Sequence, residues 1–221
     1  MSSAVIQLLV LAGIAIFLIL RLRAVLGTRE GYEKPSVPVN NRTDTVRQRR
    51  DFEVIEGGVD QDITDHVEDG SPAAKALASM KMAEPGFNVG EFLNGARGAY
   101  EMILMAFEQG DLEPVRAFLA EDVAEAFDSV IADREAQGLT VDANFVGVRD
   151  VAVVAVDYDR ERNWAEVTVR FVAELTSVVR DASGDVVEGD PSAIKRQRDI
   201  WTFARQMGTG DPNWQLVATG E

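Results

Sequence analysis

A short run of acidic residues has the spacing of the first ligands in a calcium-binding loop. Asp157, Asp159 and Glu161 alternate along the chain, as the first three oxygen ligands of such a loop do. The loop also needs a glycine at its sixth position and a bidentate glutamate at its twelfth, where this chain has Arg162 and Thr168. We therefore expect no calcium site at this run.

A second acidic group could supply carboxylates to a cation. Its four members lie within eight residues, near the first turns of a predicted helix, where negative charge interacts favourably with the helix dipole. We interpret the group as a solvated acidic face, so the sequence predicts no metal site and no cofactor. The four residues are Glu121, Asp122, Glu125 and Asp128.

Side chains that could transfer protons are few. The chain has no cysteine and one histidine, His66, which argues against thiolate catalysis and multi-histidine metal sites. Tyr100 and Asp199 remain as candidates for acid–base catalysis. Asp199 shares strand parity with Trp201 and Phe203, so its side chain could point inward. The alternative is that Tyr100 packs in the core and Asp199 lies near a rim or pairs with an arginine. We favour this alternative and predict no enzyme activity.

Gly95 and Gly98 raise the question of a phosphate-binding loop. Such a loop needs a preceding apolar strand and a motif ending in Gly-Lys-Ser or Gly-Lys-Thr, and neither is present. Residues 92–107 instead carry apolar side chains at helical spacing, with Asn88 as N-cap and Glu91 three residues later. A glycine inside a helix costs about 1 kcal/mol relative to alanine. We therefore expect a neighbouring element to approach this helix closely at both glycines.

The elements that follow this helix change from helical to strand periodicity. Helices are predicted after Gly110 and over residues 121–137, the second ending at Gly138. Apolar residues then alternate with polar ones, most clearly over residues 165–175, and residues 181–185 have the composition of a hairpin turn. Helices followed by antiparallel strands predict an α+β fold, in which the helices cover one face of a curved sheet.

The beginning of the chain has the composition of a membrane anchor. Residues 4–20 are almost entirely apolar, and as a helix they span about 25 Å, close to the ~30 Å hydrocarbon core of a bilayer. Arginines rather than a small-residue cleavage site follow the run, which favours an uncleaved single-pass helix over residues 1–26. Arg21, Arg23 and Arg29 would lie at the membrane interface and place the rest of the chain in the cytoplasm.

Residues 27–85 are predicted to form a flexible charged tether. The segment combines prolines, glycines and mixed charges, and it lacks sustained apolar periodicity. One part of it has helical features: Ser71 and Pro72 fit an N-cap and a first helical position, and Leu77 and Met80 follow on one side. This part is either a transient helix in a linker or a helix that docks onto a partner or onto the domain itself.

Charge narrows the classes of partner. The formal net charge of −15 leaves no basic surface for nucleic acid. An acidic domain is also repelled by an anionic membrane leaflet. Contact with lipid is therefore expected through the anchor, the tether arginines or an apolar pocket, and not through the general surface of the domain.

Several segments of the chain resemble, in order, the Tim44-like family, and most closely its bacterial membrane-anchored relatives of the TimA type. They are the N-terminal anchor, FLNGARGAYEMILMAFEQGD, TSVVRDASGDVVEGDP and RDIWTFARQMGTGDPNWQLVATGE. The resemblance covers residues 86–221 as one domain, besides the anchor. It implies a cone like that of nuclear transport factor two, with N-terminal helices on a concave antiparallel sheet around an apolar pocket. It also implies attachment to the bacterial inner membrane.

The resemblance implies an adaptor, because the mitochondrial member of the family recruits an Hsp70 motor to a translocon. We expect a membrane-anchored adaptor that binds a protein partner, such as a chaperone, a translocon or another membrane-protein assembly component. The alternatives are a pocket for lipid or another small hydrophobic ligand and, less favoured, an isomerase or dehydratase. About a third of the aromatic residues predicted for the pocket should face an open cavity, and the others should be core. They are Phe92, Tyr100, Phe107, Phe145, Phe171, Trp201, Phe203 and Trp214.

Overall fold

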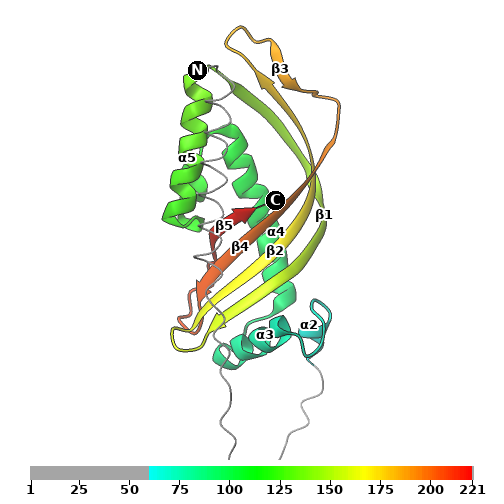
Figure 1. Ribbon diagram of the computed structural model, residues 1–221, viewed down its shortest axis with the longest axis vertical. Coiled ribbons are helices and arrows are strands. Elements are labelled where there is room, and N and C mark those ends of the chain that lie inside the picture. Colours follow the sequence, from blue (N-terminus) through cyan, green and yellow to red (C-terminus); the bar gives the residue numbers. More distant parts are fainter. Residues whose placement is uncertain (1–59, 221) are drawn as a thin grey trace, which may run out of the picture. The chain divides into compact units, whose positions relative to one another are not determined.

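Helices precede strands along the part of the chain that the computed structural model describes, residues 60–220 (Figure 1). The helices pack on an antiparallel sheet, so the predicted α+β class is confirmed. The predicted anchor, with Arg21, Arg23 and Arg29, lies outside the described residues. Within the described range, no helix is both long enough and apolar enough to cross a membrane.

The described elements comprise four α-helices, one 3-10 helix and five strands. The helices are α2 (Gln61–Thr64), α3 (Pro72–Ala83), α4 (Val89–Gln109), the 3-10 helix η1 (Glu113–Phe118) and α5 (Glu121–Ala136). The strands are β1 (Thr140–Asp159), β2 (Trp164–Arg180), β3 (Val186–Gly189), β4 (Lys195–Gln206) and β5 (Gln215–Gly220).

The helix α4 begins and ends where its sequence predicts. The backbone N–H of Glu91 donates to the side-chain oxygen of Asn88 at 2.8 Å, which confirms the N-cap. Gly110 ends the helix with a φ of 76°, a left-handed conformation that glycine adopts without steric cost. Between these ends, one face of α4 is buried against the sheet, as the apolar spacing predicts.

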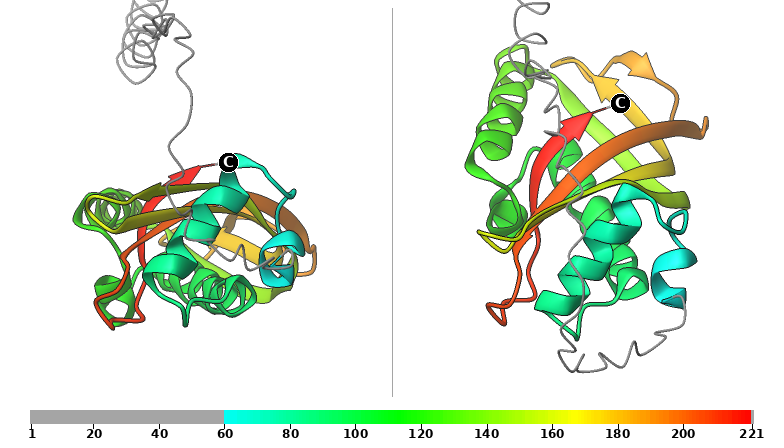
Figure 2. Two further views of the ribbon diagram at one scale, coloured as in Figure 1. Left: turned by 90° about the horizontal axis from the view of Figure 1, so that it is seen from below. Right: turned by 60° about the horizontal axis from the view of Figure 1, so that its bottom comes forward.

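The sheet is built around β2. This strand pairs antiparallel with β1 on one side and with β4 and the short β3 on the other, and β4 pairs with β5. Alternate residues of β2 are buried, which confirms the predicted strand and its inward parity. The sheet curves, and α4 lies within the curve (Figures 1 and 2). The residues of β2 with no exposed surface are Ala165, Val167, Val169, Phe171 and Ala173.

The helix α3 belongs to the folded domain and corrects the predicted tether. Leu77 and Met80 are completely buried and belong to the same hydrophobic core as α4 and the sheet. Ser71 caps the helix by accepting from the N–H of Ala74 at 3.1 Å. Of the two possibilities for this segment, a helix docked on the domain itself is the one observed. The flexible part of the prediction is therefore wrong for residues 60–85, because few but well-placed apolar side chains order this segment.

Candidate functional site

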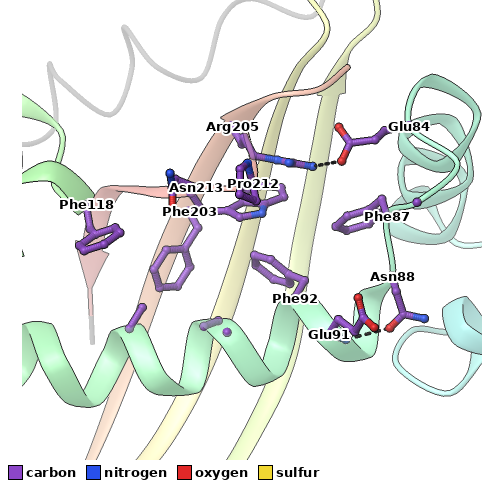
Figure 3. A pocket seen from close by; sticks show the side chains of 15 residues that line it. Glu84, Phe87, Asn88, Glu91, Phe92, Phe118, Phe203, Arg205, Pro212 and Asn213 are labelled. Carbon is purple, nitrogen blue, oxygen red and sulfur yellow. Dashed lines mark hydrogen bonds and ion pairs between the residues drawn. The ribbon is translucent and has the colours of Figure 1, made fainter. Parts of the chain in front are cut away.

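The first half of α4 borders a pocket of about 390 Å³ (Figure 3). The connection between α3 and α4 forms one side of the pocket, and the end of β4 with the loop before β5 forms another. Its volume falls within the range of pockets that bind small molecules or single side chains of a peptide. The side chains that define it are Glu84, Phe87, Phe92, Phe203, Arg205 and Trp214.

Five aromatic residues line this pocket, which we call the aromatic pocket, and four of them pack together as one cluster of rings. Phe92 lies at its centre, 4.7 Å from Trp214 and 6.2 Å from Phe203, measured between ring centroids. Phe87 packs on Phe92 at 6.3 Å and on Trp214 at 6.1 Å. Because Phe87 precedes the N-cap and Phe92 is the fourth helical residue, the two form a hydrophobic staple that fixes the entry of the chain into α4.

A buried ion pair holds the loop side of the pocket in place. Arg205 is only 7% exposed, and it donates to Glu84 at 2.7 Å and to the carbonyl of Asp211 at 2.8 Å. Burial raises the pKa of Glu84, but hydrogen bonds from the N–H of Gly208 and from Arg205 outweigh it and hold that pKa below its ordinary value. The Arg205 guanidinium also lies 5.1 Å from the centre of the Trp214 ring.

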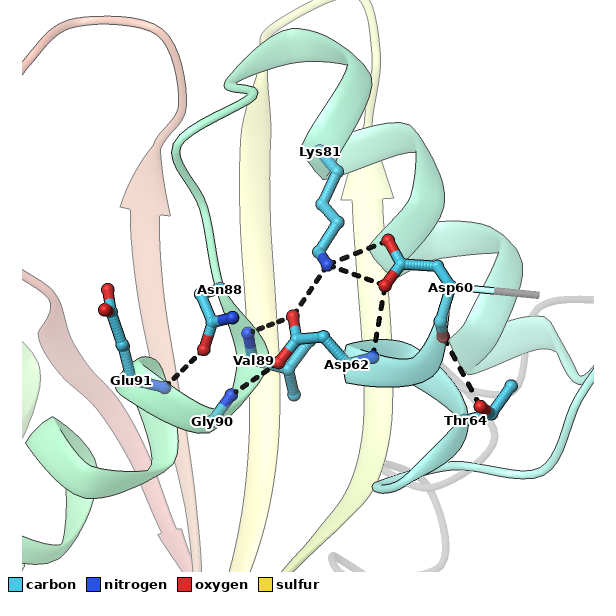
Figure 4. A network of polar contacts seen from close by, with 8 residues as sticks. All are labelled: Asp60, Asp62, Thr64, Lys81, Asn88, Val89, Gly90 and Glu91. Carbon is cyan, nitrogen blue, oxygen red and sulfur yellow. Dashed lines mark hydrogen bonds and ion pairs between the residues drawn. The ribbon is translucent and has the colours of Figure 1, made fainter. Parts of the chain in front are cut away.

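The N-terminus of α4, next to this pocket, is held by a residue from the start of the described chain (Figure 4). The N–H groups of Val89 and Gly90 donate to the two carboxylate oxygens of Asp62, at 2.8 and 3.1 Å. Lys81 lies 2.7 Å from Asp62 and 2.8 Å from Asp60, so it links α3 to the same carboxylate. Burial raises the pKa of Asp62, but these hydrogen bonds and the charge of Lys81 outweigh burial and hold that pKa below its ordinary value.

The helical glycines face open space and not a neighbouring element. A Cβ atom built on Gly95 or Gly98 would meet no atom within 4 Å. Among residues 60–220, no element makes the close approach that was predicted at these two glycines. Gly95 lines the aromatic pocket, and Gly98, three residues later, lines a second hollow that shares no lining residue with it.

The eight predicted pocket aromatics separate into three groups. Phe92, Phe203 and Trp214 line the aromatic pocket. Phe107 instead packs on Phe127 of α5 at 4.8 Å, and the guanidinium of Arg134 lies 4.3 Å from its ring centre. The remaining four form a stack between α4 and the sheet, and these are Tyr100, Phe145, Phe171 and Trp201.

Tyr100 is the centre of the buried stack. It has no exposed surface and lies 4.4 Å from Phe171 and 4.7 Å from Trp201, measured between ring centroids. Its hydroxyl donates to Asp199, which also accepts from Gln197 at 2.8 Å. Burial, together with the hydrogen bond to Asp199, raises the pKa of Tyr100 far above its ordinary value. The phenol therefore acts as a permanent hydrogen-bond donor that joins α4 to β4, an arrangement suited to packing.

The acidic runs have structural roles. Asp159 accepts from the N–H groups of Glu161 and Arg162 in the turn between β1 and β2. Asp128 accepts from Arg116 at 2.9 Å. Among the described residues, no group of three or more potential metal ligands is assembled.

Comparison with known proteins assigns the chain to a family. The Tim44-like domain model matches residues 73–221, which is well over half of the chain. The chain belongs to the Tim44-like family. The match begins at α3, so the family unit includes the helix that the sequence prediction assigned to the tether.

Proteins similar to this Tim44-like chain include a human mitochondrial protein and a chloroplast protein of known structure. The human mitochondrial import inner membrane translocase subunit TIM44 is 24% identical over 147 residues, which are 65% of this chain and 32% of that protein. The chain therefore spans about a third of the length of this relative. The crystal structure of the intermembrane space region of the chloroplast protein ARC6 is 13% identical. Its match covers 58% of this chain and 94% of that one, with a TM-score of 0.38.

Sequence reasoning missed three of the six side chains that define the aromatic pocket in the Tim44-like domain. Phe87 could have been found from its position immediately before the N-cap, which is the position of a hydrophobic staple. Glu84 and Arg205 are 121 residues apart, and no local pattern connects them. Their pairing depends on the approach of the α3 end to the β4 end, which only the tertiary structure provides.

Proposed function

We propose that this chain is a membrane-anchored adaptor whose Tim44-like domain binds a protein partner through the aromatic pocket. The observation that carries the proposal is the pocket of about 390 Å³, walled by aromatic rings and open beside a helix at Gly95. Aromatic side chains around a hollow are typical of sites that receive an anchoring side chain from a partner.

The chemistry of the pocket supports binding over catalysis. Its one buried cation, Arg205, is already paired with Glu84, and the two carry hydrogen bonds that shape the loop. Asn88, Glu91 and Asn213 line the pocket and offer polar groups to a ligand. The buried Tyr100–Asp199 pair belongs to a different part of the domain, so we propose no enzymatic role for it.

The partner class follows from the family. The human relative is named as a subunit of the mitochondrial inner membrane translocase. By analogy, we propose a chaperone, a translocon or another membrane-protein assembly component as the partner of this chain. The apolar N-terminal run and its arginines support a single-pass anchor in a bacterial inner membrane, with the domain in the cytoplasm. From the family resemblance we further propose that the domain has the cone shape of nuclear transport factor two. Tethering would raise the effective concentration of the partner at the membrane.

A lipid acyl chain or another small hydrophobic ligand is the second candidate occupant. The ring cluster of Phe87, Phe92 and Trp214 would accept a flexible apolar chain as well as a side chain. The two occupants differ in mass and chemistry, so one crosslinking experiment separates them.

The test is photo-crosslinking of the full chain in intact membranes, with the photoreactive residue at Asn213 on the pocket wall. Mass spectrometry should find protein adducts. Gly95→Leu places a side chain in the pocket and should abolish them, whereas Gly98→Leu on the same helix should not. Adducts with lipid alone, or protein adducts that persist in Gly95→Leu, would reject the proposed protein site.

A further inference from the structure

A second hollow of about 380 Å³ lies on the outward surface of α4. Gly98, Met102 and Met105 lie along one wall, and Pro114 and Val115 in η1 form the facing wall. Met102 is 40% exposed although its side chain is apolar. We call this hollow the methionine groove. It shares no lining residue with the aromatic pocket.

Packing within the domain does not account for the residues of the methionine groove. Glycine at position 98 costs the helix about 1 kcal/mol relative to alanine, and the space around it would accept a side chain. Met102 leaves apolar surface in water at the same place. Methionine side chains are flexible and polarizable, which suits a surface that repacks around a partner.

The spacing of the groove residues favours a helical occupant. Gly98, Met102, Met105 and Gln109 follow one another at intervals of four, three and four residues. This is the spacing of the seam along which one helix packs against another. The absence of a side chain at Gly98 would allow the backbone of a second helix to approach.

The charges around the groove indicate which charge a bound helix should carry. Glu101 and Asp111 line it, and none of its lining residues is basic. Nearby Arg116 is already engaged by Asp128 at 2.9 Å and lies 3.9 Å from Glu113. The whole chain carries a net charge of −15, so a second copy would be repelled, as would an anionic membrane surface. A basic segment would be attracted.

We propose that the methionine groove binds an amphipathic helix of a partner protein that carries an apolar seam flanked by lysines and arginines. The apolar seam packs on Met102 and Met105, its backbone crosses α4 at Gly98, and its basic residues pair with Glu101 and Asp111. The chain would then engage two ligands on one helix, one at the aromatic pocket and one at the methionine groove.

The first test is NMR of the full chain with labelled methionine methyl groups. The ligand used is a synthetic helical peptide of leucine and lysine with leucine at heptad seam positions, and its control has glutamate in place of lysine. The lysine peptide should cause saturable shifts at Met102 and Met105, while the buried Met80 and Met207 report on the fold. Higher salt should weaken this binding because it screens the rim charges.

The paired glycines provide the matched variants for this test. Gly98→Leu occupies the groove and should weaken peptide binding at least about tenfold, whereas Gly95→Leu should leave it within about twofold. Equal binding of the glutamate peptide overturns the proposal, as do shifts centred on the exposed Met82 or an unchanged affinity in Gly98→Leu. Shifts that depend on protein concentration without peptide would assign the groove to a second copy and also overturn it.

A photoreactive residue at position 102 of the full chain then identifies the natural occupant in membranes. The crosslinked segment should be helical in periodicity and carry net positive charge, and Glu101→Lys should reduce its yield. A crosslinked segment that is neutral or acidic, an adduct with lipid alone or the absence of any adduct would overturn the proposal. Loss of crosslinking at Asn213 with retention at position 102 would reject the proposed function of the aromatic pocket and leave this inference standing.

Discussion

The two faces of α4 differ in how closely other residues pack against them. On the inward face, Tyr100 and Ile103 have no exposed surface and pack against the sheet. On the outward face, Gly95 and Gly98 have open space around them, and Met102 is 40% exposed. Tyr100 and Ile103 fill volume in the core, whereas Gly95 and Met102 border the two hollows.

We expect the inward face of this helix to determine stability and the outward face to determine binding. Inward side chains remove apolar surface from water and therefore contribute to the free energy of unfolding. Glycines inside a helix lower that free energy and exposed methionines add little to it, which is why we propose that these residues serve ligand contacts. Substitutions on the two faces should consequently change different measurements.

The largest expected effect is on the inward face, at Tyr100. Tyr100→Ala removes a fully buried ring that stacks on Phe171 and Trp201, and it should lower the free energy of unfolding by about 3–5 kcal/mol. Urea denaturation of the full chain measures this loss. A loss below about 1 kcal/mol would show that the stack is not part of the stabilising core.

Tyr100→Phe is the matched control because it keeps the ring and removes only the hydroxyl. The variant leaves Asp199 with Gln197 as its remaining side-chain donor. We expect a loss of about 1–3 kcal/mol, the usual penalty for a buried polar group deprived of its partner. An effect as large as that of Tyr100→Ala would mean that the hydrogen bond, and not the ring, dominates at this position.

More of the fold than of the site could be predicted from the sequence, because the periodicity that identifies helices and strands is a local property of the sequence. The i, i+3, i+4 spacing of residues 92–107 and the N-cap at Asn88 fix α4 from the sequence alone. Which aromatic residue borders a cavity is a tertiary property. Trp201 and Phe203 share one face of β4, yet Trp201 joins the buried stack and Phe203 lines the pocket.

The predictions for α3 and for the glycines of α4 failed because both depended on tertiary contacts. Composition placed α3 in a tether, but the burial of Leu77 and Met80 is enough to order it against the domain. The glycines of α4 suggested an intramolecular contact, because a sequence cannot distinguish space filled by the same chain from space left for a ligand. Among the described residues, no atom lies within 4 Å of a Cβ atom built on Gly95 or Gly98.

An intermediate effect is expected at the N-terminal end of α4, which belongs to neither face. Asp62→Asn removes the negative charge that receives the N–H groups of Val89 and Gly90 and pairs with Lys81. We expect a loss of about 1 kcal/mol at neutral pH, typical of charge at a helix N-terminus and of a lost cap. Chemical denaturation of the variant and the parent chain at matched pH measures it.

The pH dependence of this effect has a defined sign. The pKa of Asp62 is lower in the folded protein than its ordinary value of 3.8, so the folded state binds the proton less tightly. Its contribution is therefore complete above the unfolded pKa and disappears as the pH falls through the folded pKa. The difference between parent and Asp62→Asn should shrink below pH 4. A difference that grows with acidification would contradict the lowered pKa.

The smallest expected effect, and the only stabilising one, is on the outward face. Gly95→Ala and Gly98→Ala each add a Cβ that meets no atom within 4 Å, and each should raise the free energy of unfolding by about 0.5–1 kcal/mol. Thermal unfolding measures this gain. Gly189→Ala is the opposing control, because its φ is 86° and its Cβ would clash with the carbonyl oxygen of Ser177. If either helical alanine is destabilising instead, the outward face is packed within the chain and the contrast between the two faces fails.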